Sequence, residues 1–433
     1  MMTQKALLLS CLVLVSPALA APPPPTIDIS RDAGGDLRFK IHDRMNGSWR
    51  MEYSPDLIDW RPQPQEVHVR NSVLPLSHYY IPAVQTSGQG YYRLAALPTP
   101  PPKTVSNTLS LPEATYGYAL HATPPAILQD SIGKALITDK KATLGRVLFY
   151  DRRLSRDNSI SCASCHQPER GFADGVAKSI GHQGKLTARN SISLQHARTY
   201  QKGSQIFWDG RGKSLDSAVL EPVSHPVEMG LSISDMQMKI REEPYYRELF
   251  NAAYQSSEPS AVRVSECLSD FIESMVSFRS KYDQHLPYNF ANFTSRERFG
   301  KEIFTARCAS CHPLGSFTSG GFANNGLDLQ YADRGRRGIT GLVADEAMFR
   351  IPSLRQVGLT APYMHDGRFA TLRQVIDFYD HGVKNHQNLT LPLKPVPMKL
   401  NEEEKLALEA FLNTLTDTSA QENPAFSDPF RTD

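Results

Sequence analysis

The chain lacks both a large excess of one charge and a long hydrophobic run beyond its first 20 residues. Its 47 basic and 45 acidic residues leave a formal net charge of +2. The overall charge therefore does not indicate a nucleic-acid-binding protein. No later stretch approaches the roughly 18 apolar residues of a membrane-spanning helix, and we expect no integral membrane span. A length of 433 residues allows two to three domains, with cores large enough to need no cross-links.

The first 20 residues predict a secretory signal peptide. Lys5 precedes a short apolar run, Ala6–Val15, and Ala18-Leu19-Ala20 supplies a small-residue cleavage site. The apolar run is too short to cross a bilayer. We therefore expect export to the periplasm through a signal peptide at residues 1–20.

Cysteine is also scarce, and four of the six cysteines fall in two copies of one pentapeptide. Cys-Ala-Ser-Cys-His occurs at Cys162–His166 and again at Cys308–His312. CxxCH is the attachment signature of a c-type haem, whose vinyl groups form thioethers with the cysteines while the histidine becomes the proximal iron ligand. A zinc knuckle would instead need four clustered soft ligands, and a redox dithiol would not need the histidine twice. The sequence thus predicts two covalent haems, attached through Cys162, Cys165, His166, Cys308, Cys311 and His312.

The two remaining cysteines agree with this prediction. Thioether attachment takes place outside the cytoplasm in bacteria, which fits the predicted export. Besides the haem cysteines only Cys11, in the signal segment, and Cys267 are left, so no intramolecular disulfide is expected. Cys267 lies in Ala261–Phe278, where apolar residues recur at helical spacing, and we expect a buried, inert thiol there.

The composition changes along the chain and predicts its organisation. Residues 27–96 hold short alternating stretches split by turn residues, which is typical of a small β-sandwich. Prolines that begin at Pro98 predict a stiff linker over residues 97–129. From about residue 130 the pattern is helical, and Gly145–Phe149 before the first CxxCH echoes Gly300–Phe304 before the second. This repetition indicates duplication of a one-haem unit.

We therefore expect a mainly α protein with two cytochrome c-like haem domains, preceded by a small β-sandwich-like module. The predicted boundaries are 130–285 for the N-terminal haem domain, 286–417 for the C-terminal haem domain and 418–433 for a tail.

Residues from about 130 to 417 resemble the bacterial di-haem cytochrome c peroxidase family, which includes the MauG-like enzymes that oxidise protein side chains. The resemblance is carried by several separated segments, which are Leu148–Ser155, Ser179–His182, Arg189–Ser191, Phe207–Arg211, Pro226–Gly230 and Leu359–Arg368. It implies that the N-terminal haem reacts with peroxide and that the C-terminal haem stores an electron.

The resemblance also implies roles for single residues. Glu228 would be the distal acid/base, which accepts a proton from bound peroxide and returns it to the leaving oxygen; its alternative is a surface glutamate in a loop. Trp208 would lie between the two haems and carry electrons; its alternative is an ordinary core tryptophan. Asn190, Thr360 and Pro362 match an inter-domain calcium site, where a side-chain oxygen and two backbone carbonyls suit a hard cation.

Three further positions decide which branch of the family the chain resembles. His182 stands where many members carry a distal histidine ligand of the peroxidatic iron; its alternative is a surface loop histidine. Ala218 replaces a distal glutamine, so one hydrogen bond to peroxide should be missing. Tyr379 falls where peroxidases place a methionine that ligates the second haem and MauG-like members place a tyrosine. If Tyr379 is only a core aromatic, Met364 or Met398 becomes the ligand.

The resemblance therefore predicts a periplasmic di-haem peroxidase that uses hydrogen peroxide to oxidise a donor, with MauG-like character. A phenolate at the second iron is a harder, anionic donor than a thioether, which favours holding oxidising equivalents. One alternative is detoxification of hydrogen peroxide with electrons from a small cytochrome or cupredoxin. Another is a non-catalytic electron carrier or haem sensor. The expected partners are hydrogen peroxide and a small redox protein or protein substrate, and a homodimer is compatible with the resemblance.

Overall fold

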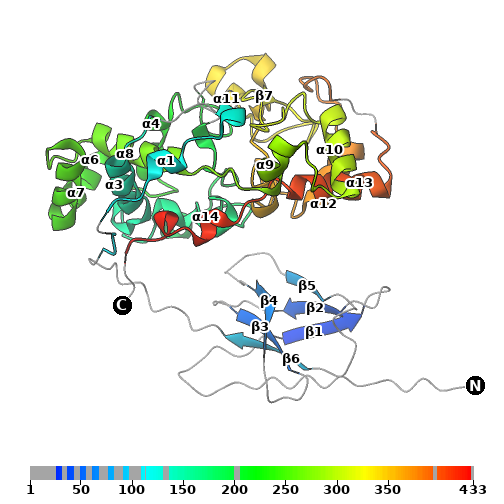
Figure 1. Ribbon diagram of the computed structural model, residues 1–433, viewed down its shortest axis with the longest axis horizontal. Coiled ribbons are helices and arrows are strands. Elements are labelled where there is room, and N and C mark those ends of the chain that lie inside the picture. The colour runs from blue at the N-terminus through cyan, green and yellow to red at the C-terminus, as the bar shows by residue number, and fades with distance from the viewer. Residues whose placement is uncertain are drawn as a thin grey trace, which may run out of the picture. The chain divides into compact units, whose positions relative to one another are not determined.

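The computed structural model describes six strand backbones between residues 26 and 96, and residues 109–112, 114–129, 136–198, 205–393 and 397–430. The chain divides into two units, Met1–Thr104 and Val105–Asp433 (Figure 1). The predicted signal peptide at 1–20 lies outside the described residues. Among the helices that are described, none is both long enough and apolar enough to span a membrane.

The first unit contains two three-stranded antiparallel sheets, with strand orders β1-β2-β5 and β4-β3-β6. The strands are β1 Thr26–Arg31, β2 Leu37–His42, β3 Trp49–Ser54, β4 Arg61–Val67, β5 Ser77–Ile81 and β6 Tyr91–Ala96. The side chains of these strands lie outside the described residues, so the face-to-face packing of a β-sandwich stays a prediction.

The second unit is mainly helical. Its α-helices are α1 Tyr118–His121, α3 Asp139–Tyr150, α4 Leu215–Ala218, α5 Glu221–Ser224, α6 Ile233–Glu242, α7 Pro244–Tyr254, α8 Ala261–Ser274, α9 Lys281–His285, α10 Ser295–Arg307, α11 Arg337–Thr340, α12 Leu372–Asp377, α13 Glu402–Asn413 and α14 Ser419–Glu422. Short 3-10 turns are η2 Ala126–Leu128, η3 Arg152–Leu154, η4 Cys162–Ser164, η5 Pro168–Arg170, η6 His182–Gly184, η8 Leu286–Tyr288, η9 Val343–Asp345, η10 Val357–Leu359 and η12 Pro424–Phe426. The π-helix η11 spans Phe378–Gly382, and the strands β7 Phe322–Ala323 and β8 Phe349–Arg350 pair antiparallel.

The first core forms where α3 crosses α8. The α3 helix begins after Thr138, whose hydroxyl accepts a hydrogen bond from the Lys141 amide at 3.3 Å. A Cβ atom on Gly145 would lie 1.9 Å from the carbonyl oxygen of Cys267, so the two backbones touch and only glycine fits at the crossing. Cys267 is buried in this core, as the sequence predicts.

The second core repeats this crossing with α10 and α13. The α10 helix begins at a capping box in which the Thr294 and Glu297 side chains bind each other's backbone amides. A Cβ atom on Gly300 would lie 1.8 Å from the carbonyl oxygen of Ala407. Each CxxCH motif thus follows a helix that crosses a later helix at a glycine, which supports the predicted duplication.

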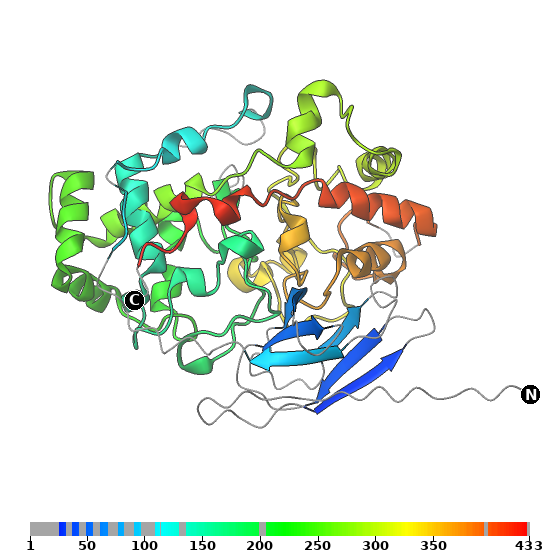
Figure 2. The ribbon, with the colours of Figure 1, turned by 60° about the horizontal axis from the view of Figure 1, so that its bottom comes forward.

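The described chain differs from the predicted boundaries at two places. Residues 118–128, which we expected in the linker, form α1 and η2, and Tyr118 and Ala122 are buried in the first core. Residues 424–430, which we expected in a tail, return to that same core, where Ala425 and Phe426 are buried. Tyr118 Oη donates to the Ala425 carbonyl oxygen at 2.9 Å. Figure 2 shows the C-terminal segment, in red, running from the second core back to the first.

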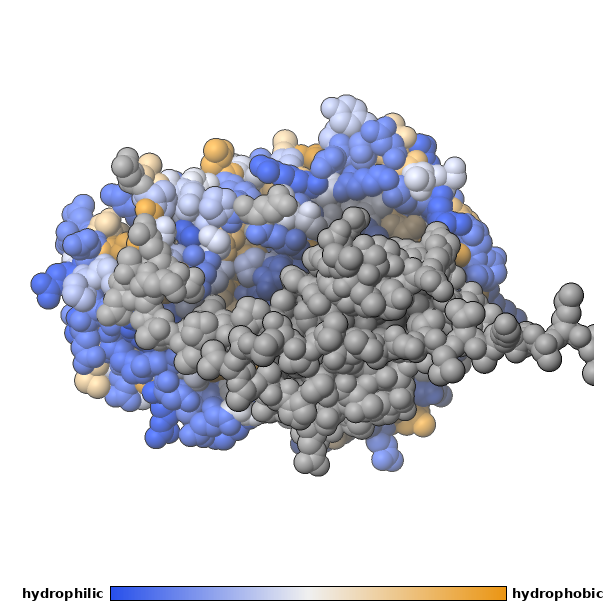
Figure 3. Space-filling view, turned by 90° about the horizontal axis from the view of Figure 1, so that it is seen from below, coloured by the Kyte–Doolittle hydropathy of each residue, from blue (hydrophilic) through white to orange (hydrophobic). Residues whose placement is uncertain are grey.

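The described part of the surface seen in Figure 3 is mainly hydrophilic, with single apolar residues between charged ones. In that view the described residues therefore present no broad apolar patch, which is ordinary for a protein surface.

Candidate active site

The first CxxCH motif sits on a tight turn. Ser161 caps η4, and its backbone amide donates to Ser164 Oγ at 3.0 Å. The turn continues into the His166 amide, which donates to the Cys162 carbonyl oxygen at 3.0 Å. His166 Nδ1 lies 2.8 Å from the carbonyl oxygen of Phe172. Because a carbonyl only accepts, Nδ1 carries the proton and Nε2 keeps a free lone pair.

The second CxxCH motif has the same local geometry. The His312 amide donates to the Cys308 carbonyl oxygen at 2.9 Å, and His312 Nδ1 lies 2.9 Å from the carbonyl oxygen of Phe317. Burial lowers the pKa of both His166 and His312, although their backbone carbonyl partners oppose this shift. Imidazoles whose Nδ1 is held by a backbone carbonyl suit the ligation of iron through Nε2.

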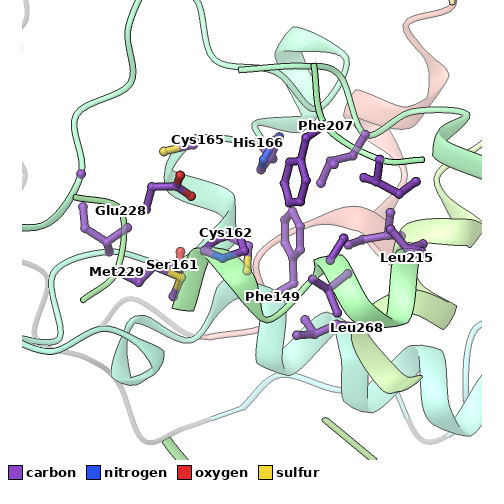
Figure 4. A pocket seen from close by; sticks show the side chains of 18 of the residues that line it. Phe149, Ser161, Cys162, Cys165, His166, Phe207, Leu215, Glu228, Met229 and Leu268 are labelled. Atoms are coloured by element: carbon purple, nitrogen blue, oxygen red, sulfur yellow. The ribbon is translucent and has the colours of Figure 1, made fainter. Parts of the chain in front are cut away.

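A cavity opens beside the first motif (Figure 4). It contains about 740 Å³ of empty space, part of it open to solvent. Cys162, Cys165 and His166 line one part of its wall. The wall also contains the apolar side chains Phe149, Ile160, Leu194, Ile206, Phe207, Leu215, Ala218, Val219, Met229, Leu268 and Ile272. These walls fit a large, mostly apolar cofactor that is fixed through two cysteines and a histidine.

Glu228 brings a carboxyl group to this cavity. It lies in the loop after α5 and points its carboxylate into the cavity (Figure 4), with 29% of the side chain exposed. Burial raises the pKa of Glu228, and the positive charges of His225 and Arg211 oppose the shift. His225 Nδ1 lies 3.6 Å from a carboxylate oxygen. Glu228 is thus a wall residue rather than the surface glutamate of the alternative, and its proton is held more firmly than usual.

His182 lies next to Glu228 but does not line the cavity. The His182 amide donates to the Glu228 carbonyl oxygen at 2.7 Å, and its Nδ1 lies 3.0 Å from a carboxylate oxygen of Asp157. Its ring packs against Gly230, where an added Cβ would lie 2.8 Å from the ring. His182 is buried, so the surface-loop alternative is wrong, while ligation of iron by His182 stays a prediction. Ala218, in contrast, lines the cavity, and the hydrogen bond to peroxide that its small side chain should lack stays a prediction.

Trp208 connects the two haem-motif segments. Its indole Nε1 donates to the Asn190 carbonyl oxygen at 2.9 Å, and its own carbonyl oxygen accepts from the Arg350 amide, in β8, at 2.8 Å. Asn190 in turn donates its backbone amide to the His365 carbonyl oxygen at 2.8 Å. Trp208 is therefore tied to residues that follow each CxxCH motif.

The residues predicted to bind calcium are not a carboxylate cluster. Asn190 Nδ2 donates to the Val176 carbonyl oxygen at 2.9 Å, and Thr360 Oγ1 lies 3.4 Å from the Val357 carbonyl oxygen. Pro362 follows Ala361 in the next loop. Among the residues that the structure describes, no group of three or more His, Cys, Asp or Glu side chains could hold a metal ion. A calcium site built on an amide oxygen and carbonyls needs no such group and stays a prediction.

Tyr379 and Met364 lie together near the second motif. Tyr379 is in η11, and its phenol interacts electrostatically with the Cys308 and Cys311 thiols. Burial raises the pKa of Tyr379 to about 12, and a hydrogen bond from Asn325 opposes the shift. The Asn325 amide nitrogen lies 3.4 Å from Tyr379 Oη and 3.5 Å from Met364 Sδ.

The third candidate ligand, Met398, has no described side-chain contact with Tyr379. Its backbone amide donates to the Asp380 carbonyl oxygen at 2.8 Å, and the described contacts do not bring its sulfur to Tyr379. Sequence reasoning missed Asn325, because a lone asparagine in a loop carries no spacing signal. It also missed the carbonyls of Phe172 and Phe317, since backbone partners depend on how each loop folds.

Known proteins match both halves of this unit. The sequence pattern of the di-haem cytochrome c peroxidase family matches residues 139–289, and that of cytochrome c matches residues 298–416. The methylamine utilization protein MauG of Methylorubrum extorquens is 33% identical over 283 residues, which are 64% of this chain and 79% of that protein. Cytochrome c551 peroxidase of Nitrosomonas europaea is 31% identical over 280 residues, with the same shares of 64% and 79%.

Solved structures give the same result. A MauG-like protein associated with microbial copper homeostasis has a TM-score of 0.64 and 32% identity, covering 74% of this chain and 100% of that one. The di-haem peroxidase BthA of Burkholderia thailandensis has a TM-score of 0.54 at 23% identity, covering 74% of this chain and 94% of that one, a likeness of fold alone.

Proposed function

Because the chain belongs to the bacterial family of di-haem cytochrome c peroxidases and MauG, which are haem c oxidoreductases, we propose that it uses hydrogen peroxide to oxidise a donor in the periplasm. The observation that carries this function is the cavity in which Glu228 faces the same space as Cys162, Cys165 and His166. We assign it MauG-like character at the second site, where Tyr379 supplies an iron ligand and the donor is a side chain of a protein.

The two CxxCH motifs would hold the haems. Cys162, Cys165 and His166 hold the first, and a second set made of Cys308, Cys311 and His312 holds the other. The hydrogen bond from Nδ1 of each histidine to a backbone carbonyl supports this assignment, since it directs Nε2 to the iron. Bound haem supplies an iron that exchanges electrons with peroxide and with the donor.

Glu228 performs the proton chemistry at the first site. Its carboxylate would take the proton from one peroxide oxygen and return it to the other as the bond between them breaks, so that one oxygen leaves as water. Two electrons from the donor and two protons from solvent would then reduce the second oxygen to water. A group that both accepts and donates a proton works best with a pKa near the operating pH. The raised pKa of Glu228 supports this role. The apolar side chains of Phe207, Leu215 and Leu268 limit the water that competes for the proton.

Trp208 carries electrons between the two sites. Two hydrogen bonds support this role. The indole of Trp208 donates to Asn190, and the backbone carbonyl of Trp208 accepts from Arg350, so the residue is joined to a segment that follows each motif. His182, whose amide donates to the Glu228 carbonyl oxygen, would supply a second ligand to the first iron in the resting protein.

A second function is favoured by one contact. Met364 Sδ lies against the same amide as Tyr379, so its thioether is a competing donor. With Met364 as the ligand, the second haem would accept electrons readily, because thioether favours ferrous iron. The protein would then detoxify hydrogen peroxide with electrons from a small cytochrome or cupredoxin.

Four structural expectations accompany this function. Asn190, Thr360 and Pro362 bind calcium through oxygen atoms. Residues 1–20 direct export. The sheets of the first unit pack as a small sandwich, and the second unit divides into haem domains near residue 285.

Spectra of the oxidised and half-reduced protein, taken before and after addition of hydrogen peroxide, test this function. We expect a high-spin iron that reacts with peroxide, and a second iron without the near-infrared band of a His/Met haem. Two six-coordinate irons that stay inert to peroxide would identify an electron carrier or sensor and refute the enzyme.

A further inference from the structure

The side-chain amide of Asn325 contacts both candidate ligands of the second site. Its Nδ2 lies 3.4 Å from Tyr379 Oη and 3.5 Å from Met364 Sδ. The three residues come from separate segments, since Asn325 follows β7, Met364 lies in the loop after η10 and Tyr379 is in η11. One amide therefore joins two side chains that sequence analysis offered as alternatives.

The chemistry of these atoms determines how the amide points. An amide nitrogen carries two N–H donors, whereas a thioether sulfur can only accept a hydrogen bond. With its oxygen and nitrogen exchanged, Asn325 would present an acceptor to the sulfur and lose that contact. One N–H is thus directed to the oxygen of Tyr379 and the other to the sulfur of Met364.

The surroundings of the three residues are mostly apolar. Met364 and Tyr379 pack against a buried cluster of Leu327, Phe378 and Val383. A hydrogen bond has a larger effect in such a low-dielectric environment than in water. Loss of the Asn325 donors would therefore be felt by both side chains.

The two hydrogen bonds affect iron binding unequally. An N–H donated to a phenolate oxygen is a strong, charge-assisted hydrogen bond that stabilises the anion, which is the form that binds iron. A thioether sulfur is neutral and a weak acceptor, and it keeps a second lone pair for iron, so an N–H stabilises it much less. The same amide thus favours ligation by the oxygen of Tyr379 over ligation by the sulfur of Met364.

We propose that Asn325 is a positioning residue that selects Tyr379 over Met364 as the ligand of the second haem iron. Ligation by Tyr379 belongs to the function proposed above, and this inference rests on it. Hydrogen-bond partners behind metal ligands commonly fix ligand orientation and affinity. Here the partner also fixes which ligand binds, and thereby whether ferric or ferrous iron is stabilised at this site.

Two substitutions in the full-length holoprotein test this role. Asn325→Leu removes both donors at a similar side-chain size, and Asn325→Asp keeps the shape but donates no hydrogen bond at neutral pH. In each we expect the ferric protein to gain the near-infrared band of a His/Met haem, and the potential of the second haem to rise above that of the wild type. Mass spectrometry should still show two covalent haems. If the variants that carry both haems keep the wild-type band pattern and potential, Asn325 does not select the ligand.

Three companion variants separate the causes. In the Asn325→Leu background, Met364→Leu should remove the new band, and the matched Met398→Leu should leave it; a band that persists without Met364 overturns the competition described here. Tyr379→Phe in an otherwise native chain tests ligation itself. An unchanged spectrum there refutes Tyr379 as a ligand, and with it the MauG-like function. A changed spectrum in Tyr379→Phe, combined with unchanged Asn325 variants, refutes only the role of Asn325.

Discussion

At the residue scale, Glu228 is the side chain that brings a carboxyl group to the wall of the cavity beside the first motif. Burial raises its pKa, and the electrostatic effect of His225 and Arg211 opposes this shift. A neighbouring carboxylate, Glu221, is paired with Arg211 at 2.9 Å and is absent from the cavity wall. The carboxylate at the start of α5 is thus in an ion pair, and the one in the loop after α5 is in the cavity.

The substitution Glu228→Gln keeps the shape of the side chain and removes the proton acceptor. We expect peroxide turnover to fall by about two to four orders of magnitude, because general acid–base catalysis is lost. Steady-state and rapid-mixing kinetics with hydrogen peroxide measure the change, and haem content should match the wild type. The control is Glu221→Gln, which should cost far less. Wild-type turnover in a fully loaded Glu228→Gln protein would show that another group moves the proton.

The substitution Tyr379→Met tests the second site by replacing the proposed ligand itself, where the Asn325 variants change its hydrogen-bond partner. Since a thioether favours ferrous iron, the second haem should rise in potential and gain the near-infrared band of a His/Met haem. Activity should shift towards reduction by a small electron-transfer protein. A redox titration followed by its spectrum measures the change. If potential and spectrum stay as in the wild type, Tyr379 is a packed aromatic and peroxide detoxification becomes the better function.

At the element scale, each CxxCH motif depends on a helix crossing that admits no side chain. An added Cβ on Gly145 or Gly300 would meet the carbonyl oxygen of Cys267 or Ala407 at less than 2 Å. Because the obstacle is backbone, the helices themselves would have to move. Phe149, in the last turn of α3, lines the cavity. The crossing therefore holds in place the helix that carries this wall residue.

The substitution Gly145→Ala should destabilise the protein by about 1–3 kcal/mol, the usual cost of overpacking a core. Thermal unfolding of the holoprotein measures it as a fall in Tm. Gly338→Ala, at a helical glycine with open space around it, is the matched control and should leave Tm nearly unchanged. Equal Tm values for the two variants would mean that α3 and α8 are not held in contact at this point.

Sequence patterns located these helices better than their ends. Apolar spacing extended the expected helix at Ala261 to Phe278, whereas α8 ends at Ser274. Met275 and Val276 are still buried, so the apolar pattern continues into a non-helical segment of the same core. A second change of this kind follows Asp377, where α12 passes into the π-helix that carries Tyr379. Local propensity does not specify such a change, which depends on contacts such as that with Asn325.

At the scale of the whole molecule, segments far apart in sequence complete the first core. Phe426 is fully buried there, with its ring centroid 6.0 Å from those of Phe172 and Phe271. The segment that carries it, residues 424–430, is too short to show a period and was not predicted to pack. The CxxCH motifs, in contrast, were predictable, because all their ligands lie within five residues.

The substitution Phe426→Ala should cost about 3–5 kcal/mol, which is typical when a buried phenylalanine is truncated. Chemical unfolding followed by tryptophan fluorescence and haem absorbance measures the loss. Phe299→Ala is the control, because Phe299 on α10 is 38% exposed and should cost much less. Similar losses in the two variants would contradict the packing of residues 424–430 on the first core.

The return of residues 424–430 to the first core also sets an order of events during biosynthesis. Phe426 is translated long after Cys162 and Cys165, and after the second motif as well. The first core cannot acquire its last buried aromatic until that late segment has emerged. Final closure of the first core therefore follows the arrival of Phe426, and Phe172 and Phe271 remain without that aromatic neighbour until the chain is almost fully synthesised.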